Sequence, residues 1–192
     1  MIKTENFDKV EITSGQDLRS WLFENFNRDQ GIWIVTYKKS EGDKYVSKEE
    51  VLDELISFGW IDGIRRKLDE KRTMQLITKR KTQHWSKTYK ERASKLIGLG
   101  KMHDAGLKAI EISKSKGLWD YLDDVDNLLI PEDLHKELSK SREALQFFNS
   151  INPSSKRFVL RWVKIAKTEK TRINRIQKLV ELSSKGEKLP GS

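Results

Sequence analysis

The sequence predicts an α+β fold class: a small, mainly antiparallel N-terminal sheet packed with helices, followed by an all-helical C-terminal part. Short runs of β-branched and aromatic residues, bounded by turn residues, lie within residues 32–78. Beyond Trp85 the apolar residues recur at the spacing of helices. This change of period predicts two domains, residues 1–100 and residues 101–192, the second ending in a pair of basic helices.

The first predicted elements alternate between strand and helix. Residues 1–13 are expected to be an extended lead-in, and residues 15–26 a helix capped by Ser14. The run IWIVTY at residues 32–37 favours a strand that is apolar on both faces. Residues 47–50 fit a capping box, S-x-x-E, and predict the start of the next helix.

That helix is predicted to end at Gly59, because glycine readily adopts the left-handed conformation that ends helices. Residues 60–68 and 73–78 predict two further strands, with a turn over residues 69–71. With residues 32–37 they give an expected sheet of three strands.

The rest of the chain is predicted to be helical, interrupted by an acidic connector that begins at Gly117. Residues 89–97 carry one apolar stripe, and Asp104 can cap a further helix. The later helices are predicted from their capping or first-turn residues, and the last from its apolar stripe: Pro131, Ser141, Asn152 and Pro153, then Ile173, Ile176, Leu179 and Val180.

The composition limits the kinds of site that the chain can carry. There is no cysteine, which excludes disulfides and thiolate chemistry. With three histidines, a zinc site is not expected. No stretch approaches the roughly 20 apolar residues that span a bilayer, and residues 1–15 contain no apolar run of signal-peptide length. We therefore expect a cytoplasmic protein without metal or cofactor.

The net charge of +9 is unevenly distributed. Residues 65–92 and residues 153–188 each contain eleven Lys or Arg against three Asp or Glu, whereas residues 117–133 contain six acids and no base. Two basic blocks favour a polyanion such as nucleic acid as partner. Charge complementarity within the chain explains the same pattern equally well.

The stretch FGWIDG at residues 58–63 is the main candidate for a ligand-binding site. On a strand Trp60 and Asp62 share one face, so that an indole and a carboxylate could shape a pocket for a cationic or hydrogen-bonding ligand. The flanking Gly59 and Gly63 would allow a ligand to approach the backbone. The structural alternative places Trp60 in the core and Asp62 in a turn or an ion pair.

Basic and aromatic residues extend this candidate site. We predict that the ligand-binding set is Trp60, Asp62, Arg65, Arg80, Trp85 and Ser86. The alternative is a solvated, charged sheet face that protects an edge strand. In the C-terminal part, Arg157, Arg161 and Lys164 form a basic helical stripe that predicts anion binding, against the alternative of the wet face of an amphipathic helix.

Catalytic motifs are missing from the sequence. Ser86 follows His84 and Trp85, but neighbours in sequence do not constitute a triad. There is no G-x-S-x-G, no phosphate-binding loop and no G-x-G-x-x-G. We assign no catalytic residue and consider an enzyme less well supported than a binding protein.

Several of these motifs together resemble the YdeI/OmpD-associated, or bacteriocin-protection, family. The resemblance rests on FGWIDG at residues 58–63, Trp85-Ser86, and the stretch from Pro153 to Ile176. The chain departs from the family pattern at three positions: Ser57 stands where the family often has Cys, Lys79 where it often has Pro, and Tyr89 where it often has Asn.

The resemblance implies a role in tolerance of antimicrobial peptides or envelope stress. It leads to the hypothesis of a non-enzymatic, cytoplasmic stress-tolerance protein that binds a small ligand or a protein partner near residues 58–63. Nucleic-acid binding through residues 65–92 and 153–188 is the first alternative, and an unrecognised enzyme is the second.

Overall fold

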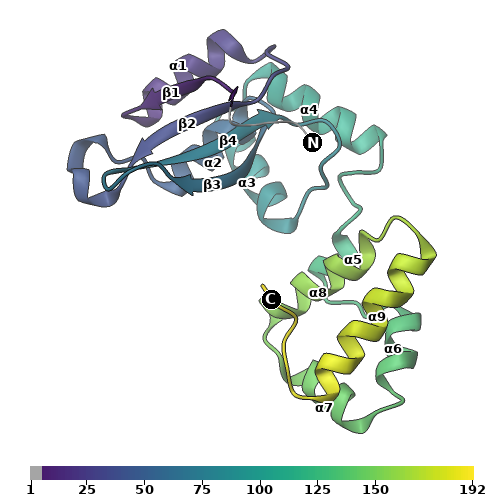
Figure 1. The fold of residues 1–192 in the computed structure, drawn as a ribbon. Helices are drawn as coiled ribbons and strands as arrows, with labels where there is room; N and C mark the ends of the chain where they lie inside the picture. The colour runs from purple at the N-terminus through teal and green to yellow at the C-terminus, as the bar shows by residue number, and fades with distance from the viewer. Residues whose placement is uncertain (1–5) are drawn as a thin grey trace. The chain divides into compact units, whose positions relative to one another are not determined.

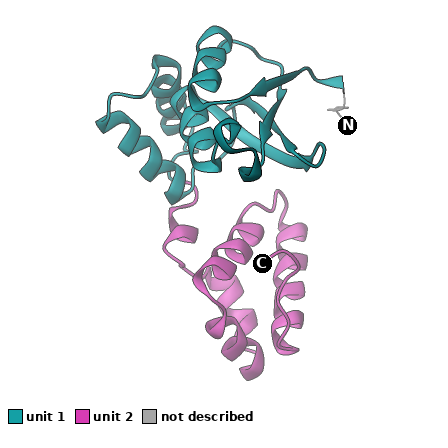
Figure 2. Cartoon of the chain, turned by 90° about the vertical axis from the view of Figure 1, so that its left-hand side faces the viewer, with its two compact units in different colours: residues 1–120 teal, residues 121–192 magenta. Residues whose placement is uncertain are grey.

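The computed structural model describes residues 6–192 and confirms the α+β fold class (Figure 1). Residues 1–5 of the predicted lead-in lie outside the described residues. The chain divides into two compact units, residues 1–120 and residues 121–192 (Figure 2). The first unit contains the sheet, and the second is helical along its described length.

The sheet has four strands in the order β1-β2-β4-β3. They are β1 (Lys9–Ile12), β2 (Ile32–Tyr37), β3 (Trp60–Lys67) and β4 (Arg72–Lys79). The pairs β2–β4 and β3–β4 are antiparallel, as predicted for a mainly antiparallel sheet, whereas β1 and β2 are parallel. The register of β3 on β4 shifts between Asp62 and Arg65, so a bulge lies at the end of the FGWIDG stretch.

Strand β1 was not predicted, because its four residues lie in the expected lead-in. The sequence KVEI is too short to show a period, and its pairing partner lies in residues 33–36. A parallel pair needs a crossover, and helix α1 (Gly15–Asn25) provides it. The Ser14 side chain accepts a hydrogen bond from the Asp17 amide and caps α1 as predicted.

The other helices of the first unit follow the predicted order. Helix α2 (Lys48–Ser57) begins with the predicted capping box, in which Ser47 and Glu50 bond reciprocally. Helices α3 (Lys87–Gly98) and α4 (Asp104–Ser115) follow β4. A 3-10 segment, Lys39–Lys44, connects β2 to α2.

Two apolar clusters form the core of the first unit. One lies between the sheet and helices α1 and α2, and contains Ile12, Ile32, Ile34, Trp60, Ile77, Leu18, Leu22, Val51 and Leu55. The other joins α2, α3 and α4 and contains Ile56, Trp85, Ala93, Leu96 and Ile110. Because Ile110 of α4 belongs to this second cluster, α4 folds with the sheet, and the unit extends to Asp120 rather than to the predicted residue 100.

The second unit contains five helices in its described length. They are α5 (Asp123–Asp126), α6 (Glu132–Leu138), α7 (Arg142–Ser150), α8 (Pro153–Lys164) and α9 (Glu169–Ser184). Side chains of Ser141, Asn152 and Thr168 cap α7, α8 and α9. Their buried faces share one core that includes Leu134, Phe148, Leu160, Val163 and Leu179. The short α5 lies inside the predicted acidic connector, where periodicity gave no sign of a helix.

Candidate functional site

Phe58 and Gly59 form the turn between α2 and β3. Phe58 caps the end of α2, and its amide donates to the Glu54 carbonyl at 3.2 Å. Gly59 has a φ of +72°, a conformation that residues with a Cβ adopt only with strain. The Gly59 carbonyl accepts a hydrogen bond from the Arg80 amide at 2.9 Å, which ties the turn to the end of β4.

Helix α4 packs so closely against this turn that the backbones of the two segments are in contact. A Cβ on Gly106 would lie 2.2 Å from the Ser57 carbonyl oxygen. A Cβ on Gly59 would lie 2.9 Å from the Ala105 carbonyl oxygen. The His103 amide donates to the Ser57 carbonyl at 3.0 Å. The turn is therefore a docking point for α4, and this explains the need for small residues on both sides.

A cavity of about 630 Å³ opens beside the turn. It is bounded by the last turn of α1, residues 58–59, residues 79–81 at the end of β4, and the face of α4 that starts at His103. A volume of this size suits a small molecule. It is the cavity that we designate the junction cavity.

The apolar wall of the junction cavity is a cluster of aromatic rings around His103. The His103 ring stacks on Phe58 with centroids 4.8 Å apart, and its centroid lies 4.9 Å from Phe26 and 5.7 Å from Phe23. Its Nδ1 accepts the Ala105 amide at 3.1 Å, so His103 rather than the predicted Asp104 caps α4. Phe23 is 61% exposed although it is a large apolar side chain.

Cations form another part of the lining. Lys79, Arg80, Lys81 and Lys108 line the cavity, and Asp104 is the acidic residue among the described lining residues. Lys81 pairs with Asp29 at 3.3 Å, and both side chains are exposed. The surplus of positive charge makes this wall suitable for an anionic group.

Arg80 is the least ordinary of these cations, because it is only 7% exposed. Its guanidinium carbon lies 4.1 Å from the ring centroid of Trp85 and 5.0 Å from that of Tyr89. Its Nη1 donates to the carbonyls of Gln83 and His84 at 3.3 and 3.4 Å, whereas Nη2 is buried without an acceptor among the described residues. Burial lowers the pKa of Arg80 to about 10.

Asp62 and Arg65 line a second, smaller cavity of about 270 Å³. The Tyr89 hydroxyl donates a hydrogen bond to Asp62, and Arg65 Nη2 donates to the Gln75 side chain at 2.8 Å. The structure thus brings these two predicted residues together but assigns Arg80 to the lining of the junction cavity.

The predicted tryptophans lie in the core. Trp60 has no exposed surface, and its ring packs edge-on against Trp21 with centroids 5.7 Å apart. Trp85 is 1% exposed and packs against Trp119 at 4.8 Å. Ser86 is the first residue before α3 and makes no capping hydrogen bond through its side chain. Trp60 and Trp85 can therefore support the site from behind, whereas direct ligand contact would require them to move.

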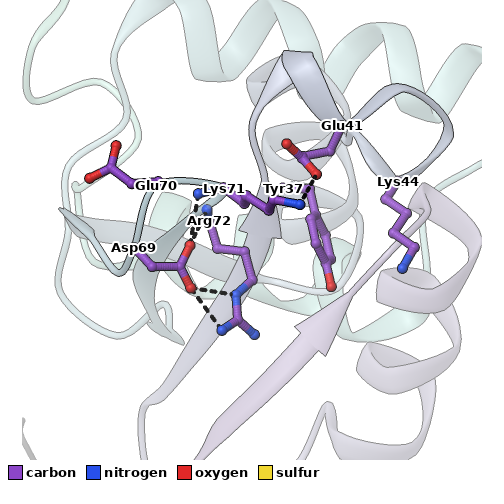
Figure 3. A pocket seen from close by; sticks show the side chains of 7 residues that line it. All are labelled: Tyr37, Glu41, Lys44, Asp69, Glu70, Lys71 and Arg72. Atoms are coloured by element: carbon purple, nitrogen blue, oxygen red, sulfur yellow. Dashed lines mark hydrogen bonds and ion pairs between the residues drawn. The ribbon is translucent and has the colours of Figure 1, made fainter.

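Another hollow of the first unit has a volume of about 650 Å³ and lies at the other end of the sheet (Figure 3). Most of its charged side chains form ion pairs: Arg72 with Asp69 and with the nearby Glu11, and Lys71 with Glu41 at 3.7 Å. The Tyr37 hydroxyl, which donates to Glu11, and the Arg72 guanidinium lower the pKa of that carboxyl. Because these groups satisfy one another, the junction cavity is the stronger candidate for a ligand.

Much of the basic block at residues 65–92 is neutralised within the first unit. Seven of its cations form ion pairs with Asp or Glu: Lys67, Lys71, Arg72, Lys81, Lys87, Lys90 and Arg92. Charge complementarity inside the chain, one of the two predicted explanations, thus accounts for most of this block.

The predicted anion-binding stripe on α8 is split by its contacts. Lys164 pairs with Asp124 at 2.5 Å, and Arg157 Nε donates to the Asp126 carbonyl at 3.3 Å. Arg161 is the exposed member of the three. The first two therefore hold α5 against α8, and Arg161 is left to face solvent.

Two findings on the described residues concern membrane spans and metal sites. None of the helices within residues 6–192 is long and apolar enough to cross a membrane. Within the same residues no three His, Asp or Glu side chains are grouped as a metal site would require.

The sequence did not reveal the residues that α1 and α4 contribute to the junction cavity. Phe23, His103 and Lys108 are far from residues 58–63 in sequence, and only the docking of α4 brings them together. Phe23 carried one usable sign: it falls outside the apolar stripe of its helix, where a large aromatic side chain is unexpected.

Comparison with known families separates the two parts of the chain. Residues 10–109, about half of the chain, match the family described as "Domain of unknown function (DUF8412)". The chain belongs to the DUF8412 family. The DUF8412 match contains FGWIDG, Trp85-Ser86 and most of the junction cavity.

The second match lies in the C-terminal unit. Residues 127–186 match the family described as "Bacteriocin-protection, YdeI or OmpD-Associated". This confirms the predicted family for the C-terminal unit, which follows the DUF8412 region in the same chain. Neither the curated proteins nor the solved structures contain a significant match.

Proposed function

We propose that the chain is a non-enzymatic, cytoplasmic protein of bacteriocin protection that binds a small ligand in the junction cavity. The observation that carries the proposal is the cavity itself, about 630 Å³ in volume, whose lining combines aromatic rings with basic side chains. The bacteriocin-protection match of residues 127–186 supports the biological role.

The charge of the cavity favours indirect protection over capture of the toxin. Many membrane-active antimicrobial peptides are cationic and amphipathic, and a basic cavity in a chain of net charge +9 would repel them. We therefore propose that the ligand is a small molecule whose binding accompanies the protective state, rather than the antimicrobial peptide.

A cavity-filling substitution tests this proposal. Ile112 of α4 lines the junction cavity and is 40% exposed, so Ile112→Trp can place an indole in the cavity without entering the core. Leu107 of the same helix is 38% exposed and is not among the lining residues, which makes Leu107→Trp a matched control.

The readout is survival of a bacterium that depends on the chain when it is challenged with a bacteriocin. We expect Ile112→Trp to lose protection and Leu107→Trp to retain it, with both variants folded by circular dichroism. Full protection by a folded Ile112→Trp variant would show that the cavity has no part in the function. Cell fractionation of the same strain tests the compartment.

A further inference from the structure

The junction cavity offers two different surfaces to one ligand. Phe23, Phe26 and Phe58 give an apolar wall, to which Ile112 adds an aliphatic side chain. The hydrophobic effect stabilises apolar ligand surface that leaves water to lie against such a wall. A ligand with an apolar body is therefore favoured over a small polar ion.

Three of the four cations that line the cavity form no ion pair among the described residues. Seven cations of residues 65–92 pair with carboxylates, as described above, and Lys81 is one of them. Lys79, Arg80 and Lys108 form no ion pair with a carboxylate among the described residues. Three cations that form no ion pair among the described residues thus gather around one cavity, although the more distant Asp62 carboxylate acts electrostatically on Arg80.

Arg80 adds an independent observation. A buried guanidinium loses most of its hydration, and an unpaired buried charge is costly unless a partner compensates it. Arg80 is held by the rings of Trp85 and Tyr89, and its Nη2 lacks an acceptor among the described residues. Asp62 acts on Arg80 electrostatically but bonds to Tyr89, so an anionic group that enters beside Arg80 would supply the missing direct acceptor.

We propose, on the basis of the ligand-binding function above, that the ligand of the junction cavity is an amphipathic anion. It has an aromatic or alkyl body, which lies against the Phe23–Phe58 wall, and one carboxylate, phosphate or sulfonate group, which binds Lys79, Arg80 and Lys108. The shared chemistry fits both a fatty acid and an aromatic acid.

Two fluorescent probes have nearly the same ring system but differ in charge, so comparing their affinities measures the contribution of the anionic group. Anilinonaphthalenesulfonate carries one sulfonate, and phenylnaphthylamine is its neutral counterpart. A charge-assisted contact stabilises binding by about 1.5–3 kcal/mol, so we expect the full chain to bind the anionic probe at least about tenfold more tightly. This preference should weaken as salt is added, because salt screens charges near the surface.

Charge reversal and cavity filling then separate the two proposals. Lys108 is exposed on α4. Lys108→Glu should weaken binding of the anionic probe about tenfold, whereas the affinity for the neutral probe should change by less than about twofold. Lys136→Glu, an exposed change of equal charge in the second unit, should leave both probes unchanged. Ile112→Trp should weaken binding of both probes.

Each result has one meaning. If Ile112→Trp leaves both probes unchanged, the cavity does not bind ligands and the proposed function fails with it. If Ile112→Trp weakens both probes but Lys108→Glu does not discriminate between them, the cavity binds ligands and the proposed anion preference is wrong. Competition with the anionic probe by decanoate or by naphthoate then identifies an alkyl or an aromatic ligand. If neither compound competes, the proposal of an amphipathic anion is also overturned.

Discussion

The two units of this chain are held together in different ways. In the first unit, segments far apart in sequence are in direct backbone contact. Ser57 and Gly59 pack against α4, and the Gly59 carbonyl also accepts a hydrogen bond from the Arg80 amide. In the second unit each of the helices α7, α8 and α9 starts with its own capping side chain, three residues before the amide that it binds. Helices of the first unit are capped as well, at Ser14, Ser47 and His103, but there tertiary contacts also create a cavity, whereas the second unit combines local caps with one apolar core.

The largest effect that we expect comes from the close approach at Gly59. Gly59→Ala combines a strained φ of +72° with a Cβ only 2.9 Å from two atoms of α4, so we expect a loss of about 3 kcal/mol in unfolding free energy. Gly100 has a similar φ of +65° and no atom within 4 Å of its virtual Cβ. Gly100→Ala should therefore cost only about 1 kcal/mol.

Urea denaturation of both variants measures the difference. Because their backbone conformations match, the excess cost of Gly59→Ala reports the contact with α4 alone. Equal costs for the two substitutions would mean that α4 does not restrain the turn, and the contrast between the two units would lose its main support.

A smaller effect is expected at the helix starts. The Asn152 side chain accepts the Ser155 amide at 2.8 Å, so Asn152→Ala should cost about 1 kcal/mol. Ser86 occupies the same position before α3 but makes no capping bond through its side chain. Ser86→Ala should change stability by no more than about 0.5 kcal/mol.

Hydrogen exchange locates these effects along the chain. Asn152→Ala should speed exchange in the first turn of α8, whereas Ser86→Ala should leave α3 unchanged, because the ring of Trp85 and the bond from its amide to the Leu118 carbonyl hold that helix start. A large effect at Ser86 would show that this residue stabilises the start of α3 without a capping bond, and the expected difference between the two helix starts would be wrong.

The same contrast explains what could be predicted from sequence. The capping residues Ser14, Ser47, Ser141 and Asn152 were all recognised, because a cap and its helix are neighbours in sequence. Strand β1 was missed, because four residues carry no period and parallel pairing depends on a distant partner. The docking of α4 was missed for the same reason, and with it the extent of the first unit.

The candidate site was only partly accessible to prediction. Arg80 was recognised from its charge and its aromatic neighbour, and it does line the junction cavity. Trp60 was placed on one strand face with Asp62, but which face is buried depends on where α1 and α2 pack, and Trp60 lies in that core. Sequence spacing defines faces, whereas tertiary packing decides which face encloses a cavity.

The smallest expected effect concerns a local charge cluster on α9. Glu181 lies between Lys185 at 2.7 Å and Lys178 at 3.0 Å, one turn away on either side. Hydrogen bonds from these two lysines lower the pKa of Glu181 from 4.5 to about 2. Since the folded-state pKa lies below the unfolded value, the carboxylate stabilises the helix above pH 4.5, and this contribution disappears as the pH falls toward about 2.

Glu181→Gln removes this contribution. The variant should be slightly less stable than the unmodified chain near neutral pH, and the difference should vanish by about pH 2, because the protonated carboxyl and the amide are then both uncharged. The exposed Glu111 of α4 forms no ion pair among the described residues, so Glu111→Gln serves as the control. Because all three charges lie within two turns of one helix, the effect should be confined to α9. A loss of stability in the sheet of the first unit would contradict the local character assigned to the second unit.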